Sequence, residues 1–172
     1  MTICFVHKNK IYADTTIGMG AYTLNGYRKI FQEVVLHEDG HTPLLRTIAV
    51  SGEMHLITKM VDYWLRRGPL PEPCLPSEGY AELIVADSLD DKPVSVGIVT
   101  SLDSKVLTPY PIISTLIIGR EADALATRAL LEADVDPEQV IVILDKVSAY
   151  KFKGMDVVEW CDLGPWEGKA YV

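Results

Sequence analysis

Paired cysteines and long apolar runs are both missing from this 172-residue sequence. Its three cysteines are scattered along the chain and form no Cys-x-x-Cys pair: Cys4, Cys74 and Cys161. Such a set excludes a disulfide framework and fits a reducing compartment. No apolar run approaches the roughly 18 residues of a membrane-spanning helix, and the first residues lack the apolar region of a secretory signal. We therefore expect a cytoplasmic protein without a membrane span.

Positive charge is also scarce. Sixteen Lys and Arg stand against 24 Asp and Glu, which gives a net charge of −8 and an isoelectric point near 4.9. An acidic chain repels polyanions, which argues against nucleic acid or anionic membranes as partners. The sequence also contains no Gly-x-Ser-x-Gly, P-loop or Gly-x-Gly-x-x-Gly motif. The length predicts a single domain over residues 1–172.

Apolar periodicity predicts many short strands and three helices. Residues 53–67 repeat apolar side chains at helical spacing, between an acidic first turn and a basic last turn that a glycine follows. An N-cap aspartate and a first-turn proline introduce a second helix over 137–147, and another is expected at 121–133. Strands are expected at 2–6, 11–14, 30–36, 44–50, 80–86, 94–100, 104–107, 112–118 and 156–160.

The order of these elements predicts the fold class. Strands come first, then a helix, more strands, two helices and a last strand, so strands and helices do not alternate strictly. A doubly wound parallel sheet is therefore unexpected, and sheets stacked between helical layers fit better. The proline-rich stretch over 69–76 interrupts regular structure, and we interpret it as a surface loop within one domain.

One segment matches the His-Glu-x-x-His pattern of zinc peptidases, namely His37-Glu38-Asp39-Gly40-His41. In that pattern both histidines lie on one helix face, and the glutamate is the general base. Here Asp39-Gly40 is a strong turn signal, and no helical apolar period surrounds it. We expect a solvated hairpin tip without a metal. The alternative is a zinc peptidase that uses His37 and His41.

The second residue carries the main functional hypothesis. If Met1 is removed, Thr2 presents a hydroxyl and a free amine on one residue, which makes a nucleophile with its own base. Asp14 ends the neighbouring predicted strand, and Lys29 precedes the next β-rich run. A lysine ammonium near Thr2 stabilises the alkoxide, and a carboxylate holds that lysine in place. The alternative is an ordinary strand-end aspartate beside a surface lysine.

Taken together, several segments resemble the proteasome β-subunit family, which includes the bacterial ATP-dependent peptidase subunit and short proteasome-like proteins of bacteriophages. The segments that match the family's nucleophile, its aspartate and its catalytic lysine are Met1-Thr2-Ile3, Ala13-Asp14-Thr15 and Arg28-Lys29-Ile30. The turn before its first long helix is matched by Val50-Ser51-Gly52, and its third helix by Ile118-Gly119 with Asp123-Ala124-Leu125-Ala126 and Ala129-Leu130-Leu131. Its closing stretch is matched by Tyr150 with Gly154-Met155-Asp156-Val157-Val158.

The resemblance implies an α+β fold, a four-layer α/β/β/α sandwich of the N-terminal-nucleophile hydrolase type. It also implies a threonine peptidase in which Thr2 is the nucleophile, Asp14 and Lys29 supply electrostatics, and the Gly52 N–H forms the oxyanion contact. The expected substrate is a peptide or an unfolded protein, with no cofactor and no metal. The family further implies a homo-oligomer, with an ATPase as a possible partner.

The chain departs from the family at three places. In one, the proline-rich stretch over 69–76 stands where the family has its second long helix. Gly119-Arg120-Glu121 stands where the family has Gly-Ser-Gly, so a serine near the nucleophile is replaced by arginine. Ser148-Ala149-Tyr150-Lys151 stands where the family has Asp-x-Tyr-Ser or Asp-x-Tyr-Thr, so Ser148 and Lys151 replace an aspartate and a hydroxyl. These changes favour the alternative that the protein is non-catalytic and keeps the fold as an assembly or binding protein.

Overall fold

Two antiparallel sheets, a small hairpin sheet and three helices make up the described part of the computed structural model, which is residues 2–19, 22–24, 26–37, 39–66, 79–109 and 115–160. The first sheet has the strand order β10-β1-β2-β11, and the second has β5-β6-β7-β8-β9. The elements are β1 (Ile3–His7), β2 (Lys10–Asp14), β3 (Ile17–Met19), β4 (Tyr22–Leu24), β5 (Ile30–Leu36), β6 (Pro43–Gly52), α1 (Met54–Arg66), β7 (Ala81–Leu89), β8 (Lys92–Thr100), β9 (Asp103–Pro109), β10 (Ile117–Gly119), α2 (Glu121–Glu132), α3 (Pro137–Val147) and β11 (Met155–Glu159).

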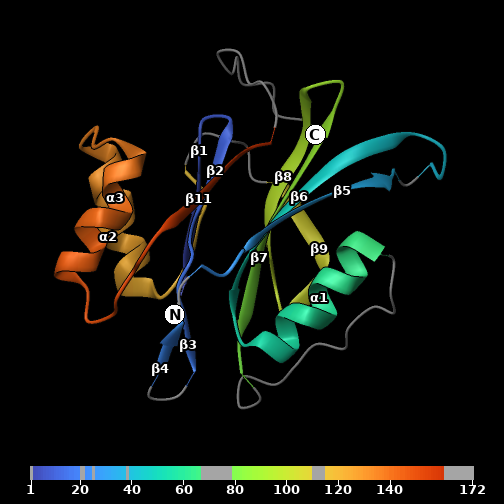
Figure 1. Ribbon diagram of the computed structural model, residues 1–172. Coiled ribbons are helices and arrows are strands. Elements are labelled where there is room, and N and C mark those ends of the chain that lie inside the picture. Colours follow the sequence, from blue (N-terminus) through green and yellow to red (C-terminus); the bar gives the residue numbers. More distant parts are fainter. Residues whose placement is uncertain are drawn as a thin grey trace.

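The helices cover the outer faces of the two sheets. Figure 1 shows α2 and α3 beside the first sheet, on the side away from the second sheet, and α1 on the far side of the second sheet. Three buried clusters of apolar residues correspond to these contacts. One joins the two sheets, one joins α1 to the second sheet, and one joins α2 and α3 to the first sheet. Burial of apolar surface in these contacts is the main favourable term in folding.

The core between the sheets is built from the alternation of side chains along each strand. Alternate residues of a strand point to opposite faces, so one set faces the other sheet and the next set faces the helices. Cys4 and Val6 of β1 belong to the core between the sheets, whereas Ile3 and Phe5 pack with α2 and α3. Since β1 is buried on both faces, the run Ile3–Val6 is apolar throughout.

Most elements lie where the sequence predicts them. The predicted helices over 53–67, 121–133 and 137–147 are observed at Met54–Arg66, Glu121–Glu132 and Pro137–Val147. The Asp136 side chain accepts a hydrogen bond from the Glu138 backbone N–H, as expected of its N-cap position. The first two strands are adjacent in the first sheet, and β7 and β8 form the expected hairpin.

Two predictions about strands need correction. Of the run expected at 112–118, residues 115–118 are described, and only Ile117 and Ile118 belong to a strand, β10, which ends at Gly119. The short β3–β4 hairpin was not anticipated, since three-residue strands are too short for an alternating pattern to show. Residues 110–114 and most of the proline-rich stretch, including 69–76, lie outside the described residues.

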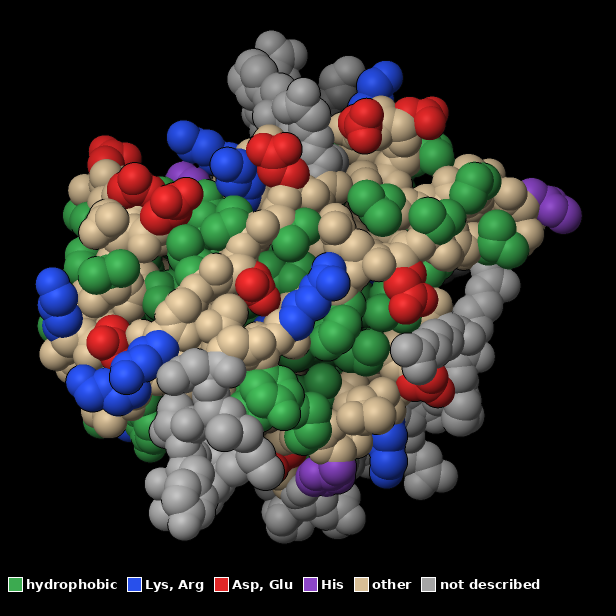
Figure 2. All heavy atoms as spheres, in the orientation of Figure 1, with side chains coloured by type: hydrophobic (Ala, Val, Ile, Leu, Met, Phe, Trp, Pro, Cys, Tyr) green, Lys and Arg blue, Asp and Glu red, His purple; other side chains and the backbone are tan. Residues whose placement is uncertain are grey.

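Charged side chains are mixed on the face that Figure 2 shows, with Lys and Arg interspersed among Asp, Glu and apolar groups. Within the described residues of that face, no broad field of one sign stands out. None of the helices described is both long enough and apolar enough to cross a membrane.

Candidate functional site

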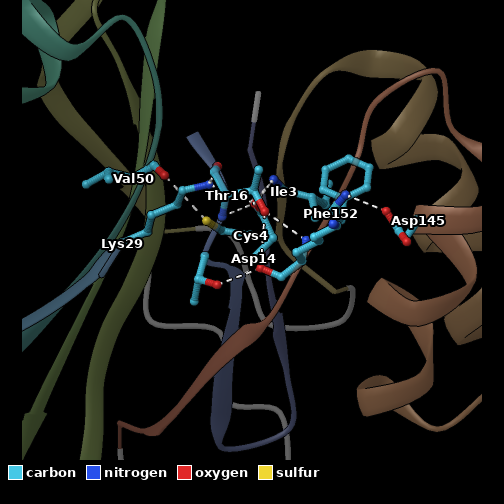
Figure 3. Close-up of polar contacts among 10 residues, drawn as sticks. Ile3, Cys4, Asp14, Thr16, Lys29, Val50, Asp145 and Phe152 are labelled. Atoms are coloured by element: carbon cyan, nitrogen blue, oxygen red, sulfur yellow. Dashed lines mark hydrogen bonds and ion pairs between the residues drawn. The ribbon is translucent and has the colours of Figure 1, made fainter. Parts of the chain in front are cut away.

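A buried ion pair joins two of the residues that the sequence singled out. Lys29 Nζ lies 3.0 Å from Asp14 Oδ1 and 2.9 Å from Asp14 Oδ2. Asp14 is 0% exposed and Lys29 is 3% exposed. The lysine comes from the segment before β5 and the aspartate from the end of β2, so the pair bridges the two sheets (Figure 3). The interpretation of Lys29 as a surface lysine is therefore wrong.

All three ammonium protons of Lys29 have an acceptor nearby. Besides the two carboxylate oxygens of Asp14, Nζ makes a short contact with the Thr16 backbone carbonyl. A lysine ammonium has three donors and no acceptor. A further hydrogen bond to the Thr2 hydroxyl would therefore need one of these contacts to be shared. In this arrangement Lys29 acts on a nearby oxygen mainly through its charge.

The carboxylate of Asp14 also holds the start of β1. The Ile3 backbone N–H donates to Asp14 Oδ1 at 2.8 Å, and the Thr16 backbone N–H donates to Oδ2 at 3.0 Å. Burial raises the pKa of the Asp14 carboxyl above its usual range, and the Lys29 ammonium and these two N–H groups counteract that rise. Thr2 is 8% exposed and directly precedes Ile3, so the ion pair is fixed to the residue next to the proposed nucleophile.

The other side of the chain start lies against β10. Ile3 pairs with Gly119 in the first sheet, and a Cβ added to Gly119 would lie 2.5 Å from the Thr2 carbonyl oxygen. Gly119 has a φ of 137°, a conformation that favours glycine. Its N–H donates to Glu82 Oε2 at 3.0 Å, and Glu82 is a residue of β7. The backbone of Thr2 therefore lies close against Gly119 of β10, while the Asp14 carboxylate on the β2 side holds the N–H of the next residue.

Gly52 ends β6 in the second sheet. Its φ is 118°, and an added Cβ would lie 2.3 Å from the Tyr80 carbonyl oxygen, so only glycine fits this turn. The preceding residue, Ser51, pairs with Glu82, which holds the Gly119 N–H. Gly52 is thus connected to the start of β1 through two neighbouring pairs. The predicted role of its N–H as an oxyanion contact stays a prediction.

Cys4 lies beside the ion pair but belongs to the core. Its Sγ donates to the Val50 carbonyl oxygen at 3.4 Å, as Figure 3 shows, and its side chain is fully buried. Burial and the nearby Asp14 carboxylate raise the pKa of the thiol far above its usual range. A thiol that stays protonated is a poor nucleophile, which agrees with the interpretation of Cys4 as a core residue.

Two threonines after Asp14 tie the site to the segment before β11, and the sequence reasoning did not single them out. Thr15 Oγ1 donates to the Lys153 carbonyl at 2.7 Å, and Thr16 Oγ1 accepts from the Lys153 N–H at 2.7 Å. The Phe152 N–H donates to Asp145 Oδ1 at 3.0 Å, which connects this segment to α3. The run of hydroxyl residues directly after the Asp14 strand end is the sequence signal that could have found them.

The residues that depart from the family pattern lie directly before α2 and at the C-terminal end of α3. Arg120 directly follows Gly119 and is exposed, with its guanidinium carbon 4.8 Å from the centre of the Tyr150 ring. Lys151 is exposed and donates to the Asp145 carbonyl at 3.2 Å. Ser148 caps the C-terminal end of α3, and its Oγ accepts from the Tyr150 N–H at 3.1 Å. The structure gives these three residues structural partners of their own.

The His-Glu-x-x-His segment forms the turn between β5 and β6, as the sequence predicts. The Gly40 N–H donates to the His37 carbonyl at 2.9 Å, and Asp39 Oδ1 accepts from the backbone N–H groups of His41 and Thr42. Glu38 lies outside the described residues. Among the residues that are described, no group of three or more His, Cys, Asp or Glu side chains is placed to hold a metal ion.

Known proteins were compared with the whole chain. No family model and no curated protein sequence matches it. Several solved structures do match. One is an Anbu mutant from Hyphomicrobium sp. strain MC1, with a TM-score of 0.60 and 10% identity over 94% of this chain and 82% of that one. Another is the helical assembly of the Anbu complex from Pseudomonas aeruginosa, with a TM-score of 0.61 and 12% identity over 94% and 81%. A third is Anbu, described as an ancestral beta-subunit, from Yersinia bercovieri, with a TM-score of 0.62 and 10% identity over 92% and 81%.

This chain has the fold of the Anbu proteins. The likeness extends over more than nine-tenths of the chain at low sequence identity, so it establishes the fold alone. The mixed α/β architecture with antiparallel sheets and helices on their outer faces agrees with the fold class that the sequence predicts. Activity depends on the groups in the site, because one fold hosts many functions.

Proposed function

We propose that the protein is a proteasome-like threonine peptidase of the N-terminal-nucleophile class, with Thr2 as the nucleophile once Met1 is removed. The observation that carries this proposal is the bond from the Ile3 N–H to Asp14, whose carboxylate also pairs with the buried Lys29. An ion pair with no access to solvent is costly to build, and such groups cluster at functional sites. Here it supports the residue that follows Thr2.

In the proposed mechanism, Thr2 Oγ attacks the scissile carbonyl, and its proton passes to the Thr2 α-amine directly or through a water. The amine then gives the proton to the leaving amine of the peptide, and water hydrolyses the acyl-enzyme by the same steps. The Lys29 ammonium stabilises the developing alkoxide, Asp14 fixes Lys29, and the Gly52 N–H contacts the oxyanion.

The proposal also includes the family, the layer architecture, the oligomeric state and the substrate. We assign the chain to the proteasome β-subunit family and its layers to a four-layer α/β/β/α sandwich of the N-terminal-nucleophile hydrolase type, on the strength of its three apolar clusters. A homo-oligomer is proposed because an Anbu complex forms a helical assembly. The proposed substrate is a peptide or an unfolded protein in the cytoplasm, with an ATPase as a possible partner.

A second candidate is a non-catalytic protein of the same fold that serves in assembly or binding. Two observations favour it. Lys29 already has three acceptors, which leaves no separate donor for Thr2. Arg120 and Lys151 are exposed cations where the family has neutral residues. The two candidates differ in whether Thr2 reacts.

The deciding experiment is covalent labelling of Thr2 by a peptide that carries an electrophile, on protein whose loss of Met1 is verified by intact mass. Wild type and Thr2→Ser should be labelled, because both keep the hydroxyl and the amine. Thr2→Ala should not be labelled. Thr58→Ala is the matched control, since Thr58 lies exposed on α1 and should leave labelling unchanged. Absence of labelling in processed, assembled wild type would leave the non-catalytic candidate as the better one.

A further inference from the structure

The first turn of α2 contains a buried carboxylate that lacks a partner. Asp123 is 4% exposed, and its Oδ2 is fully buried without a hydrogen bond to any of the described residues. The ion pairs found among those residues do not include it. Its backbone carbonyl is used, since Thr127 Oγ1 donates to it at 2.7 Å, but Oδ2 of the side chain accepts no hydrogen bond from the described residues.

Such a group needs an explanation. A buried ionised carboxylate without a partner is strongly unfavourable, and native proteins almost always pair it. The other two buried aspartates follow this rule, because Asp14 pairs with Lys29 and Asp87 pairs with Arg46. The position near a helix N-terminus offsets only a small part of the cost of burying this charge. A cationic donor is therefore the expected partner of Asp123.

The helix that carries Asp123 begins at the end of the first sheet where β1 begins. Gly119 pairs with Ile3, and α2 follows it after a single residue, its N-cap Arg120. Asp123, Thr127 and Leu131 form the buried face of α2, and Leu131 belongs to one apolar cluster with Ile3 of β1. Asp123 is the first of these three along α2 and so lies in the helical turn that follows Gly119.

We infer that Asp123 is a positioning residue for Thr2, whose α-ammonium, once freed by the removal of Met1, is the missing partner of this carboxylate. The inference rests on the proposed function only for that removal. A new chain terminus at Thr2 brings a cation with three donors to the end of the sheet where Asp123 is buried. The resemblance leads one to expect an aspartate at position 148, where the chain has serine, and Asp123 supplies a carboxylate from α2 instead.

In the proposed reaction the carboxylate stays ionised. The Thr2 hydroxyl proton moves to the α-amine, and Asp123 orients that amine and stabilises the ammonium that forms, much as the aspartate of a serine protease supports its histidine. Other charged or titratable groups around the start of β1 have partners of their own, so they compete little for the amine: Asp14, Lys29, Cys4, Glu82, Arg120 and Lys151.

The test measures the pKa of the Thr2 amine without requiring catalysis. Protein that has lost Met1 is acetylated with a limiting amine-reactive reagent from pH 6 to pH 9, and modification of Thr2 is followed by mass spectrometry. Asp123→Asn should lower the pKa of the amine by about one unit or more, the scale of losing an opposite charge. Asp123→Glu should restore part of the shift. Glu121→Gln, in the same helical turn but exposed, is the matched control and should change the pKa much less.

A second measurement keeps the inference testable if Asp123→Asn folds poorly. The melting temperature is compared with and without Met1, for wild type and for Asp123→Ser, since serine is tolerated in a first helical turn. Removal of Met1 should raise the melting temperature of wild type and not that of the variant. Equal shifts in both, or equal amine pKa changes in Asp123→Asn and Glu121→Gln, would overturn the inference. If the pKa shift is found but Thr2 is never labelled, the inference stands and the peptidase proposal fails.

Discussion

Two buried aspartates at opposite sides of the start of β1 have opposite surroundings. Asp14 is 0% exposed and accepts from the Lys29 ammonium and from the N–H groups of Ile3 and Thr16. Asp123 is 4% exposed, and its Oδ2 accepts from none of the described residues. The first is a completed site, whereas the second is a site that still needs a cation.

The two aspartates differ in role: Asp14 stabilises the folded core, whereas Asp123 has a carboxylate oxygen that is free to bind a cation. Asp14 joins the two sheets through Lys29, so its hydrogen bonds belong to the folded core. Asp123 lies on a helix that covers only one sheet, and it is not a member of the apolar cluster that joins this helix to the sheet.

Breaking the Asp14–Lys29 ion pair should have the largest effect on stability. Lys29→Met removes the cation and leaves Asp14 buried without its charge partner. Loss of one member of a buried pair costs about 3–5 kcal/mol. We therefore expect the free energy of unfolding, measured with urea, to fall by about that amount.

Lys153→Met is the control for Lys29→Met. The Lys153 side chain is exposed, and only its backbone takes part in the bonds to Thr15 and Thr16. An exposed substitution of this kind changes stability by about 0.5 kcal/mol or less. Equal effects of the two variants would show that the Asp14 pair contributes little to stability.

The Arg46–Asp87 pair should contribute less to stability than the Asp14–Lys29 pair, because it is only partly buried. Arg46 makes two bonds to Asp87, of 2.7 and 2.6 Å, and donates to the Trp64 carbonyl at the end of α1. Hydrogen bonds to charged groups contribute about 1.5–3 kcal/mol. Arg46→Lys should lower the free energy of unfolding by about 1–2 kcal/mol, because lysine cannot reproduce the two parallel bonds. Urea unfolding of Arg46→Lys and Lys29→Met, measured side by side, shows which ion pair contributes more to the free energy of unfolding.

Neutralising the Asp123 carboxylate should raise the free energy of unfolding, whereas breaking either ion pair lowers it. In protein with a short N-terminal extension, where Thr2 has no free amine, Asp123→Asn should raise the free energy of unfolding by about 1 kcal/mol, since it removes an uncompensated buried charge. Glu121→Gln should instead lower it by a few tenths of a kcal/mol, because an exposed first-turn carboxylate interacts favourably with the helix dipole. Both free energies are measured by urea unfolding, and a loss of stability in Asp123→Asn would contradict the prediction.

The smallest effect concerns an exposed carboxylate whose hydrogen bonds come from its own turn. The Thr42 hydroxyl and the N–H groups of Thr42 and His41 lower the pKa of Asp39 to about 2. Because its pKa is lower in the folded state, its stabilising effect is complete above the ordinary aspartate pKa, near 3.9, and is lost as the pH falls through about 2. The NMR amide signals of His41 and Thr42 should therefore stay constant down to about pH 3. A midpoint near 3.9, or a shift with a midpoint near 2 that persists in Asp39→Asn, would contradict this.

Local patterns determined much of this protein. Helical spacing and an N-cap aspartate followed by proline located α3 at Pro137–Val147, and the Asp39-Gly40 turn excluded a helix through the two histidines. The candidate residues Thr2, Asp14 and Lys29 were also chosen from the sequence, with the help of a family resemblance. These features depend on residues close together in the chain, where propensity and spacing carry the information.

Only the tertiary structure decided how distant residues meet. The sequence could not tell whether Lys29 is a surface lysine or the buried partner of Asp14, because that depends on how the two sheets pack. It gave no sign that Glu82 binds the Gly119 N–H or that Asp123 faces inward without a partner. Such contacts follow from strand register and sheet packing, in which a shift of one residue turns every side chain to the other face, and periodicity within one segment does not set that register.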